Sequence, residues 1–244
     1  MQPHSNPLYL YELALENGRS ASPFVWRIRY ALAHKGIPFE TKYLGFIEIP
    51  RIFDGKFKTV PILEHGDTAL AESWDIAEYL DRAFPQQPLL FNTPAEYALV
   101  RLMDAWFMNE VMRKMFRVYV KDVHDAARSV DRPYFRESRE KGMKGKTLES
   151  FTADRATHLP AIRASLAPLR AHLQKFRFLG GTAPNFADYI ALGGFYWAAA
   201  AGTLPLLERD DSLRDWLDRG FNLYGGIARD PGIEPLFEGG SSSR

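Results

Sequence analysis

The chain of 244 residues contains no cysteine. Disulfide bonds, thiolate zinc sites and cysteine nucleophiles are therefore excluded, and any thiol chemistry must use a thiol that a ligand brings. The six histidines are scattered along the sequence, and no pair has the spacing of an HExxH or zinc-finger motif. The sequence therefore gives no reason to expect a metal site, although it does not exclude one.

A large net charge and long hydrophobic runs are also lacking. The net charge is +1, so composition does not favour nucleic acid or an anionic membrane as the main partner. No apolar run approaches the roughly 20 residues that span a bilayer. The N-terminal stretch MQPHSNPLYLYEL does not have the charged and apolar regions of a signal peptide. We therefore expect a cytoplasmic globular protein with no membrane or nucleic-acid partner.

The first third of the sequence predicts a small α/β unit. Short apolar runs predict strands, and two of them flank the turn EHGD; an amphipathic run opened by Ser22-Pro23 and another, SWDIAEYLDRAF, predict helices. The predicted elements are a strand over 8–13, a helix over 23–35, a strand over 39–44, a loop over 45–58, the hairpin strands VPIL and TALAES, and a helix from residue 73. This order predicts a mixed sheet with helices packed on it.

The stretch PQQPLLFNTP marks a boundary, after which the sequence predicts helices only. We expect two domains, 1–90 and 94–244. In the helical part we expect a long helix to about residue 125, begun by a capping box of Thr93 and Glu96, and then an irregular charged segment over 128–150. A helix over 151–176, bent near Pro160 or Pro168, should follow. Next we expect a helix capped by Asn185 with Asp188 in its first turn, and a last helix from Ser212.

Three short pieces of the first unit carry candidate chemistry. Ser22 opens the first helix, Pro61 opens a strand behind Val60 and is a candidate cis proline, and Glu72-Ser73 opens the next helix. An exposed backbone at Val60 suits an extended ligand. Ser73 at a helix N-terminus suits a carboxylate, and the acidic side chain of Glu72 suits an ammonium group, so together they match an α-amino-acid head group.

Each of these residues also has a purely structural interpretation. Ser22 can be a helix cap and nothing more. Glu72 can be an ordinary acid in the first turn of a helix, and Pro61 an edge-strand breaker. Ser20 competes with Ser22 for any ligand contact, since it precedes the same helix. The occurrence of all three pieces in this order is what favours a binding site.

The sequence is similar to the glutathione S-transferases over nearly its whole length. The resemblance rests on SPFVWRIRYAL, on VP before the third strand, on ESWDIAEYL, and on PNFADYIAL in the helical half. A closer resemblance, in DRPYFRESREK and LRDWLDRGFNLYGGIARDPGIEPLF, is to the bacterial β-aryl etherases of lignin breakdown and to fungal etherase-like transferases. It implies a thioredoxin-like domain with a four-stranded mixed sheet, followed by an all-α domain.

The resemblance also implies roles in binding glutathione as co-substrate. Val60 would pair its backbone with the cysteinyl part beside a cis Pro61, and Glu72 and Ser73 would hold the γ-glutamyl end. Ser22 would face the sulfur. The glycine carboxylate would be bound by Lys58 or Lys56, because the residue directly before Val60 is Thr59 and not the glutamine or lysine often found at that position in the family.

The reaction implied is glutathione-dependent reductive cleavage of β-aryl ethers, with a small aromatic substrate in an apolar cleft and a homodimer as the assembly. Candidate cleft walls are Phe46, Met115 and Tyr119, although aromatic residues on a long helix are more often core. Two alternatives stay open on the same scaffold: a general conjugator of electrophiles, and a carrier that binds aromatic ligands without catalysis.

Overall fold

The computed structural model describes residues 7–240. A four-stranded sheet forms one side of the molecule, with the strands β1 (Leu8–Leu13), β2 (Glu40–Leu44), β3 (Ile62–His65) and β4 (Thr68–Ala71). The order across the sheet is β2-β1-β3-β4. β1 runs parallel to β2 and antiparallel to β3, and β3 and β4 form an antiparallel hairpin. The predicted strands and the mixed sheet are confirmed, with β2 beginning at Glu40.

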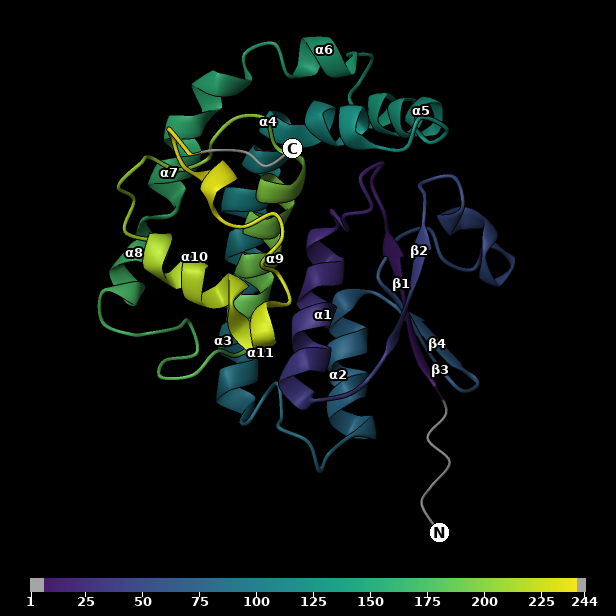
Figure 1. Ribbon diagram of the computed structural model, residues 1–244, viewed down its shortest axis with the longest axis vertical. Helices are drawn as coiled ribbons and strands as arrows, with labels where there is room; N and C mark the ends of the chain where they lie inside the picture. The colour runs from purple at the N-terminus through teal and green to yellow at the C-terminus, as the bar shows by residue number, and fades with distance from the viewer. Residues whose placement is uncertain (1–6, 241–244) are drawn as a thin grey trace.

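Two helices, α1 (Pro23–Lys35) and α2 (Ser73–Ala83), pack beside each other between the sheet and the helical half of the chain (Figure 1). The N–H of Val25 donates to Ser22 Oγ over 3.3 Å, so Ser22 is the expected N-cap. Gly36 ends α1 with φ 63°, a conformation that favours glycine. This unit is the thioredoxin-like domain that the motif order predicts.

The rest of the chain is helical (Figure 1). The α-helices are α3 (Pro94–Trp106), α4 (Arg113–Ala126), α5 (Arg132–Gly142), α6 (Leu148–Phe151), α7 (Leu159–Ser165), α8 (Ala167–Leu173), α9 (Phe186–Ala201), α10 (Arg214–Phe221) and α11 (Leu223–Gly226). A π-helical segment, η3 (Phe107–Met112), joins α3 to α4, so the predicted long helix is continuous but locally widened.

Helix α9 is the centre of the helical half, and every one of its residues is buried. Asn185 caps it through the Ala187 N–H, and Asp188 completes the capping box by accepting from the Asn185 N–H at 3.1 Å. The same carboxylate, fully buried, also accepts from Leu179 N at 2.8 Å and from Trp216 Nε1 at 2.9 Å. Asp188 therefore ties α9 to α10 and to the preceding loop.

Helix α1 packs closely against α9. A Cβ at Gly193 would lie 2.4 Å from the carbonyl oxygen of Pro23, so only glycine permits this approach at the first residue of α1. Because α9 covers the face of α1 that the sheet leaves open, most of α1 is buried. Arg27 is 2% exposed and forms an ion pair with Asp104 over 2.9 Å.

The segment 128–150 is not irregular as expected, since it forms α5 and α6. Its charges hide the helical pattern: Arg136 pairs with Glu140 at 2.8 Å and with Glu149 at 2.8 Å, while only Phe135 on α5 is buried. Helix propensity and ion pairs thus stabilise α5, which buries only one side chain. The sequence of this helix therefore has no hydrophobic periodicity from which it could be predicted.

Three further expectations need correction. The helix expected over 151–176 is broken, because Pro160 and Pro168 each begin a new helix, α7 and α8. Ser212 does not cap α10, which begins at Arg214 without a side-chain cap. Thr93 caps α3 as expected, but Glu96 accepts from the N–H of Asn92 at 2.9 Å rather than closing a capping box.

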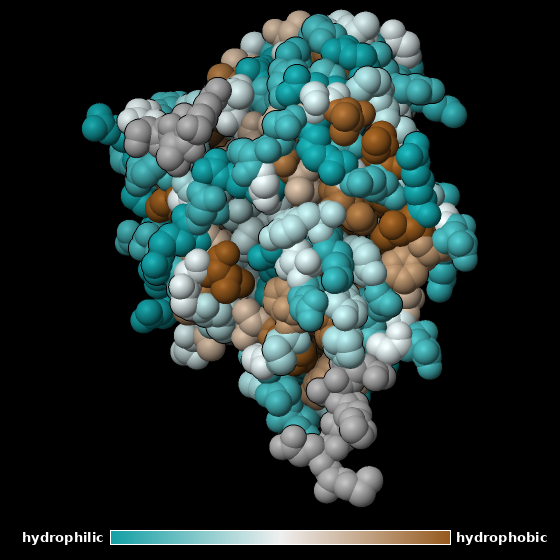
Figure 2. Space-filling model, turned by 45° about the vertical axis from the view of Figure 1, so that its right-hand side comes forward, coloured by the Kyte–Doolittle hydropathy of each residue, from teal (hydrophilic) through white to brown (hydrophobic). Residues whose placement is uncertain are grey.

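The surface is mostly hydrophilic, with hydrophobic side chains gathered in a few places on the face that Figure 2 shows. Within residues 7–240 no helix is both long enough and apolar enough to cross a bilayer. Leu99 and Leu102 on α3 are each 66% exposed, which is high for leucine.

Candidate functional site

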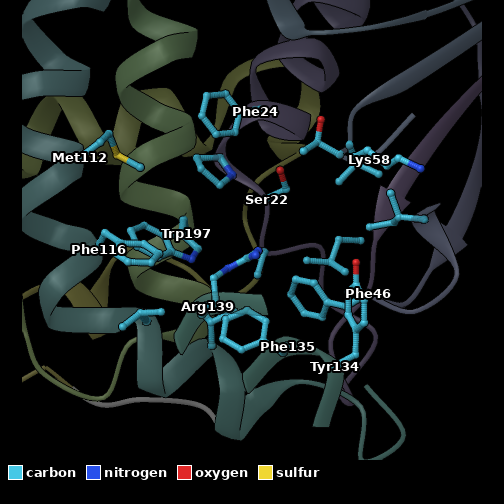
Figure 3. Close-up of a pocket in the computed structure, with 18 of the residues that line it drawn as sticks. Ser22, Phe24, Phe46, Lys58, Met112, Phe116, Tyr134, Phe135, Arg139 and Trp197 are labelled. Carbon is cyan, nitrogen blue, oxygen red and sulfur yellow. The ribbon is translucent and has the colours of Figure 1, made fainter. Parts of the chain in front are cut away.

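A cavity of about 410 Å³ lies where the sheet unit meets α4, α5 and α9 (Figure 3). The sheet unit contributes the start of α1, the loop after β2 and the segment before β3. The helical half contributes side chains from η3 to α5 and Trp197 from α9. The cavity therefore depends on how the two halves of the chain pack together.

Ser22 lies on the wall of this cavity, at the N-terminus of α1. Its oxygen accepts one long hydrogen bond from Val25 N, and its hydroxyl proton is not used by that cap. Ser20, the competitor, is 4% exposed and does not line the cavity; its carbonyl accepts from Trp26 Nε1 at 2.8 Å. Of the two serines, Ser22 is the one placed to meet a ligand in the cavity.

Val60 and Lys58 line the cavity next to Ser22, together with Thr59. The peptide bond between Val60 and Pro61 is cis, as expected. Val60 precedes β3, so its backbone lies outside the strand pairing that begins at Ile62. Lys58 is exposed, whereas Lys56 is not part of the wall and lies over the ring of Phe57.

Glu72 and Ser73 stand at the N-terminus of α2. Glu72 is exposed and adopts φ 70° and ψ 120°, a conformation that costs a non-glycine residue about 1–3 kcal/mol. Ser73 is buried, and its Oγ lies 3.5 Å from Nη1 of Arg27. Arg27 stands five positions beyond Ser22, so its side chain links the start of α2 to α1.

The charges around Ser73 are of both signs. Arg27 adds a cation behind the positive end of α2, and Asp104 from α3 adds a carboxylate that also accepts from Trp74 Nε1 at 2.6 Å. Burial lowers the pKa of Arg27, and the charge of Asp104 opposes that change. This arrangement can match a carboxylate and an ammonium group on one ligand.

The cavity wall is largely aromatic and aliphatic. Phe46 lies on it as expected and meets the ring of Phe135 edge-on, with centroids 4.7 Å apart. The other two expected wall residues are misplaced: Met115 and Tyr119 are completely buried and do not line the cavity. Tyr119 donates its hydroxyl to the Leu204 carbonyl oxygen at 3.0 Å. The same helix presents Met112, Phe116 and Val120 instead.

The long helix also changes its winding beside the cavity. The π-helical turn η3 inserts a wider ring into the long helix, which shifts every following residue around the helix axis relative to a regular α-helix. Met108 and Met112, at its two ends, both reach the cavity wall. Met112, Phe116 and Val120 recur at intervals of four and share one face of the long helix, whereas Met115 and Tyr119 lie on its buried face.

All charged side chains that line the cavity are cationic: Lys58, Arg113 and Arg139. Arg139, on α5, is half-buried between the rings of Phe135 and Phe46, at 4.8 and 6.0 Å from their centroids. Within residues 7–240 no group of three or more His, Asp or Glu side chains could hold a metal ion. The electrostatic character of the cavity therefore favours anions.

A group of hydrogen bonds and ion pairs holds α5 against the loop that follows β2. Asp131 is fully buried and accepts from Ile47 N at 2.9 Å and from Arg128 Nε at 2.7 Å. Arg128 also pairs with Glu48 at 2.7 Å. These contacts hold Phe46 and Phe135 together and close one side of the cavity.

Sequence reasoning missed Arg27, Asp104 and Arg139. Arg27 had a weak signal, since it sits among apolar residues in the first helix. Asp104 and Arg139 had none, because their neighbours in space come from elements far away along the chain.

Two family models match the chain. One, the glutathione S-transferase N-terminal domain, matches residues 21–83, and the other, the glutathione S-transferase C-terminal domain, matches residues 98–203. Among curated proteins, glutathione S-transferase U1 of Arabidopsis thaliana is 33% identical over 108 residues, or 41% of this chain and 46% of that protein. The chain thus matches about half the length of this relative.

A longer match is with the glutathione S-transferase-like protein ustS of Aspergillus flavus, 24% identical over 79% of this chain and 80% of that protein. Among solved structures, CsGST63524 of Ceriporiopsis subvermispora, in complex with glutathione, superposes with a TM-score of 0.75 at 21% identity, covering 90% of this chain and 96% of that one. GSTFuA3 from Phanerochaete chrysosporium superposes with a TM-score of 0.72 at 23% identity, covering 95% of this chain and 96% of that one. The fold is shared throughout, and because the two family models together span most of its length, the chain belongs to the glutathione S-transferase family.

Proposed function

We propose that the protein is a glutathione transferase that acts on aromatic compounds, and that its reaction is the cleavage of β-aryl ethers. The observation that carries the proposal is the cavity itself, which has Ser22 at a helix N-terminus on one wall and aromatic side chains on the others. The complex of CsGST63524 with glutathione supports glutathione as co-substrate.

Glutathione would lie across the starts of α1 and α2. Its γ-glutamyl carboxylate would meet Ser73 and the free N–H groups of α2, and its ammonium group would meet Glu72. The cysteinyl backbone would pair with Val60, next to the cis Pro61. Lys58 is the cation on the cavity wall that suits the glycine carboxylate. The thiol would then lie at Ser22.

At Ser22 the protein would favour the thiolate. A free thiol of this kind has a pKa of about 8.5, so little thiolate exists near neutral pH. Lowering the pKa by two units takes about 2.7 kcal/mol. A charge-assisted hydrogen bond from the Ser22 hydroxyl, together with the positive end of α1, is of that size. No side-chain base is required.

The thiolate would attack the carbon that bears the aryl ether, next to a ketone. A carbon–sulfur bond forms while the carbon–oxygen bond breaks, and the electron pair leaves with the phenolate. The protein contributes orientation of the two substrates and stabilisation of charge. Helix α5 supports this narrower proposal, because the segment DRPYFRESREK that resembles the etherases forms it and supplies Tyr134, Phe135 and Arg139 to the cavity wall.

We also propose that the protein forms a homodimer, as members of its family generally do. A second copy suits the outer face of α3, where Leu99 and Leu102 are exposed beside a groove whose lining is mostly apolar. A stable two-fold interface buries such residues on both partners.

The first prediction concerns the γ-glutamyl site. Ser73→Ala removes a hydrogen bond to a charged group, which costs about 1.5–3 kcal/mol, and should weaken glutathione binding by roughly 10- to 100-fold. Isothermal calorimetry measures this, with the exposed Ser212→Ala as the matched control. Unchanged affinity in a folded Ser73→Ala variant would remove this site from the proposal.

Position 72 supplies an internal check on the same site. Because φ is 70°, Glu72→Gly should be more stable than Glu72→Ala by about 1 kcal/mol, the reverse of an ordinary position. Both variants should bind glutathione more weakly than the parent, because both remove the carboxylate. Chemical unfolding and calorimetry on the same samples separate the conformational effect from the binding effect.

The second prediction separates the possible activities. A ketone carrying a β-aryl ether should release its phenol in the presence of glutathione, faster than a generic aryl halide electrophile forms a conjugate. Chromatography of both reactions measures the two rates. Conjugation of the halide alone would indicate a general transferase, and displacement of an aromatic dye without any product would indicate a carrier.

The third prediction concerns Ser22. Ser22→Ala removes the cap and the donor together, so the protein should lose about 1 kcal/mol of stability. The pKa of bound glutathione, read from the ultraviolet absorbance of the thiolate, should rise by a unit or more, and turnover near neutral pH should fall with it. Ser22→Gly keeps most of the cap stability and serves as the control for the loss of the hydroxyl.

If both Ser22 variants keep the parent thiol pKa and turnover, Ser22 is a cap only. The thiolate would then depend on backbone N–H groups and the helix end. Ser20→Ala is expected to be silent in the same assays, since Ser20 does not line the cavity.

The fourth prediction is that light scattering at micromolar concentration gives twice the chain mass of 27.8 kDa. Leu99→Arg together with Leu102→Arg should return the mass to that of one chain, because two charges would be buried at the interface. A parent protein that scatters as a single chain refutes the dimer.

A further inference from the structure

Of the three cavity cations, Arg113 and Arg139 are not assigned to glutathione, and Arg139 is the half-buried one of these two. Lys58 lies next to Val60 and is assigned to glutathione, whereas Arg139 comes from α5 on the opposite side. Figure 3 shows the Arg139 side chain extending from α5 into the cavity, in the direction of Ser22. It therefore faces the space where the second substrate would lie.

Arg139 has no acidic partner in the described part of the chain. Its one hydrogen bond to a side chain is from Nη1 to Ser138 Oγ, at 3.3 Å. Of the other arginines on or near α5, Arg128 pairs with Glu48 and Asp131, and Arg136 pairs with Glu140 and Glu149. Arg132 donates to the carbonyl oxygen of Ala127 and does not line the cavity. Arg139 is therefore the arginine of α5 that the cavity contains.

The surroundings of Arg139 make an unpaired charge at this position unfavourable. Burial lowers its pKa, and its neighbours are the aromatic rings of Phe46 and Phe135 rather than carboxylates. Ring faces attract a guanidinium group, but they leave its N–H fork free for an oxyanion. A half-buried arginine held in this way is preorganised to bind an anion, because its stem is already immobilised.

We propose that Arg139 determines specificity for aromatic substrates that carry an anionic oxygen, which its guanidinium group binds while the rings of the cavity hold the aromatic part. This inference rests on the proposed function only for the identity of the second substrate. The binding site itself requires neither glutathione nor turnover.

The test compares 1-naphthoate with 1-naphthamide, which have nearly the same shape and differ in charge. Calorimetry measures both affinities in the presence of S-methylglutathione, which fills the glutathione site without a free thiol. The parent protein should prefer naphthoate by about 10- to 100-fold, the range expected for a charge-assisted bidentate pair. Arg139→Met should abolish the preference, and Arg139→Lys should restore part of it.

Two controls separate Arg139 from the general charge of the protein. Lys141→Met removes an equal charge from the same helix but outside the cavity, and should leave the preference unchanged. Arg113→Met removes an exposed cation of the cavity and should alter the preference by less than about fivefold, because solvent screens exposed charges. The melting temperature of Arg139→Met should change little, since no ion pair is lost and the methionine side chain can still pack on the rings of Phe46 and Phe135.

Naphthoate binding that is equally tight in Arg139→Met overturns the inference. So does an equal loss of naphthoate and naphthamide, which would make Arg139 a packing residue. A third overturning result is an unchanged preference with a raised thiol pKa for bound glutathione, which would make Arg139 a partner of the thiolate. Glutathione titrations of the parent report on the proposed function separately, so its failure would not resemble any of these results.

Discussion

The close contact between α1 and α9 is the constraint on which the site depends. Gly193 lets the backbone of α1 touch α9 at Pro23, directly after Ser22. Near the start of α9, the Asp188 carboxylate accepts hydrogen bonds from the loop before the helix, from the N-cap Asn185 and from Trp216 of α10. The N-terminus of α1 is therefore held against the helical half, and the cavity forms beside it. A bulkier residue at position 193 would displace Ser22 together with the first turn of α1.

The same contact explains why α1 carries charge on a buried face. With the sheet on one side and α9 on the other, α1 has little exposed surface, and Arg27 must find a partner inside the protein. Asp104 supplies it, and breaking a buried pair of this kind costs about 3–5 kcal/mol because one charge is left uncompensated. The pair lies beside Ser73, so the residues that hold the two halves together also shape the start of α2.

The sequence was most informative where local chemistry determines structure. Ser22 and Asn185 cap their helices, Gly36 ends one, and Pro61 follows a cis bond, all as their local patterns predict. It was least informative where structure depends on distant contacts. The paired charges of α5 mask its helical pattern. On α4, Phe116 lines the cavity while Met115 and Tyr119 are buried in the core, and the sequence does not tell which apolar face of that helix meets the cavity. Both helices are needed to complete the cavity wall.

Two residues at the proposed ligand sites, Glu72 and Arg139, cost this protein stability. Glu72 adopts a conformation that glycine would adopt more easily, and Arg139 is partly removed from water without a carboxylate. Neither arrangement is favoured by folding alone, since each costs free energy in the unliganded protein. Both residues border the space where ligands would lie, and a ligand with an ammonium group at one end and a second ligand with an oxyanion at the other would recover that cost. The cavity is lined by cations although the net charge of the whole protein is only +1. The positive electrostatic potential is therefore confined to the cavity, and it acts on ligands that enter the cavity rather than on distant partners.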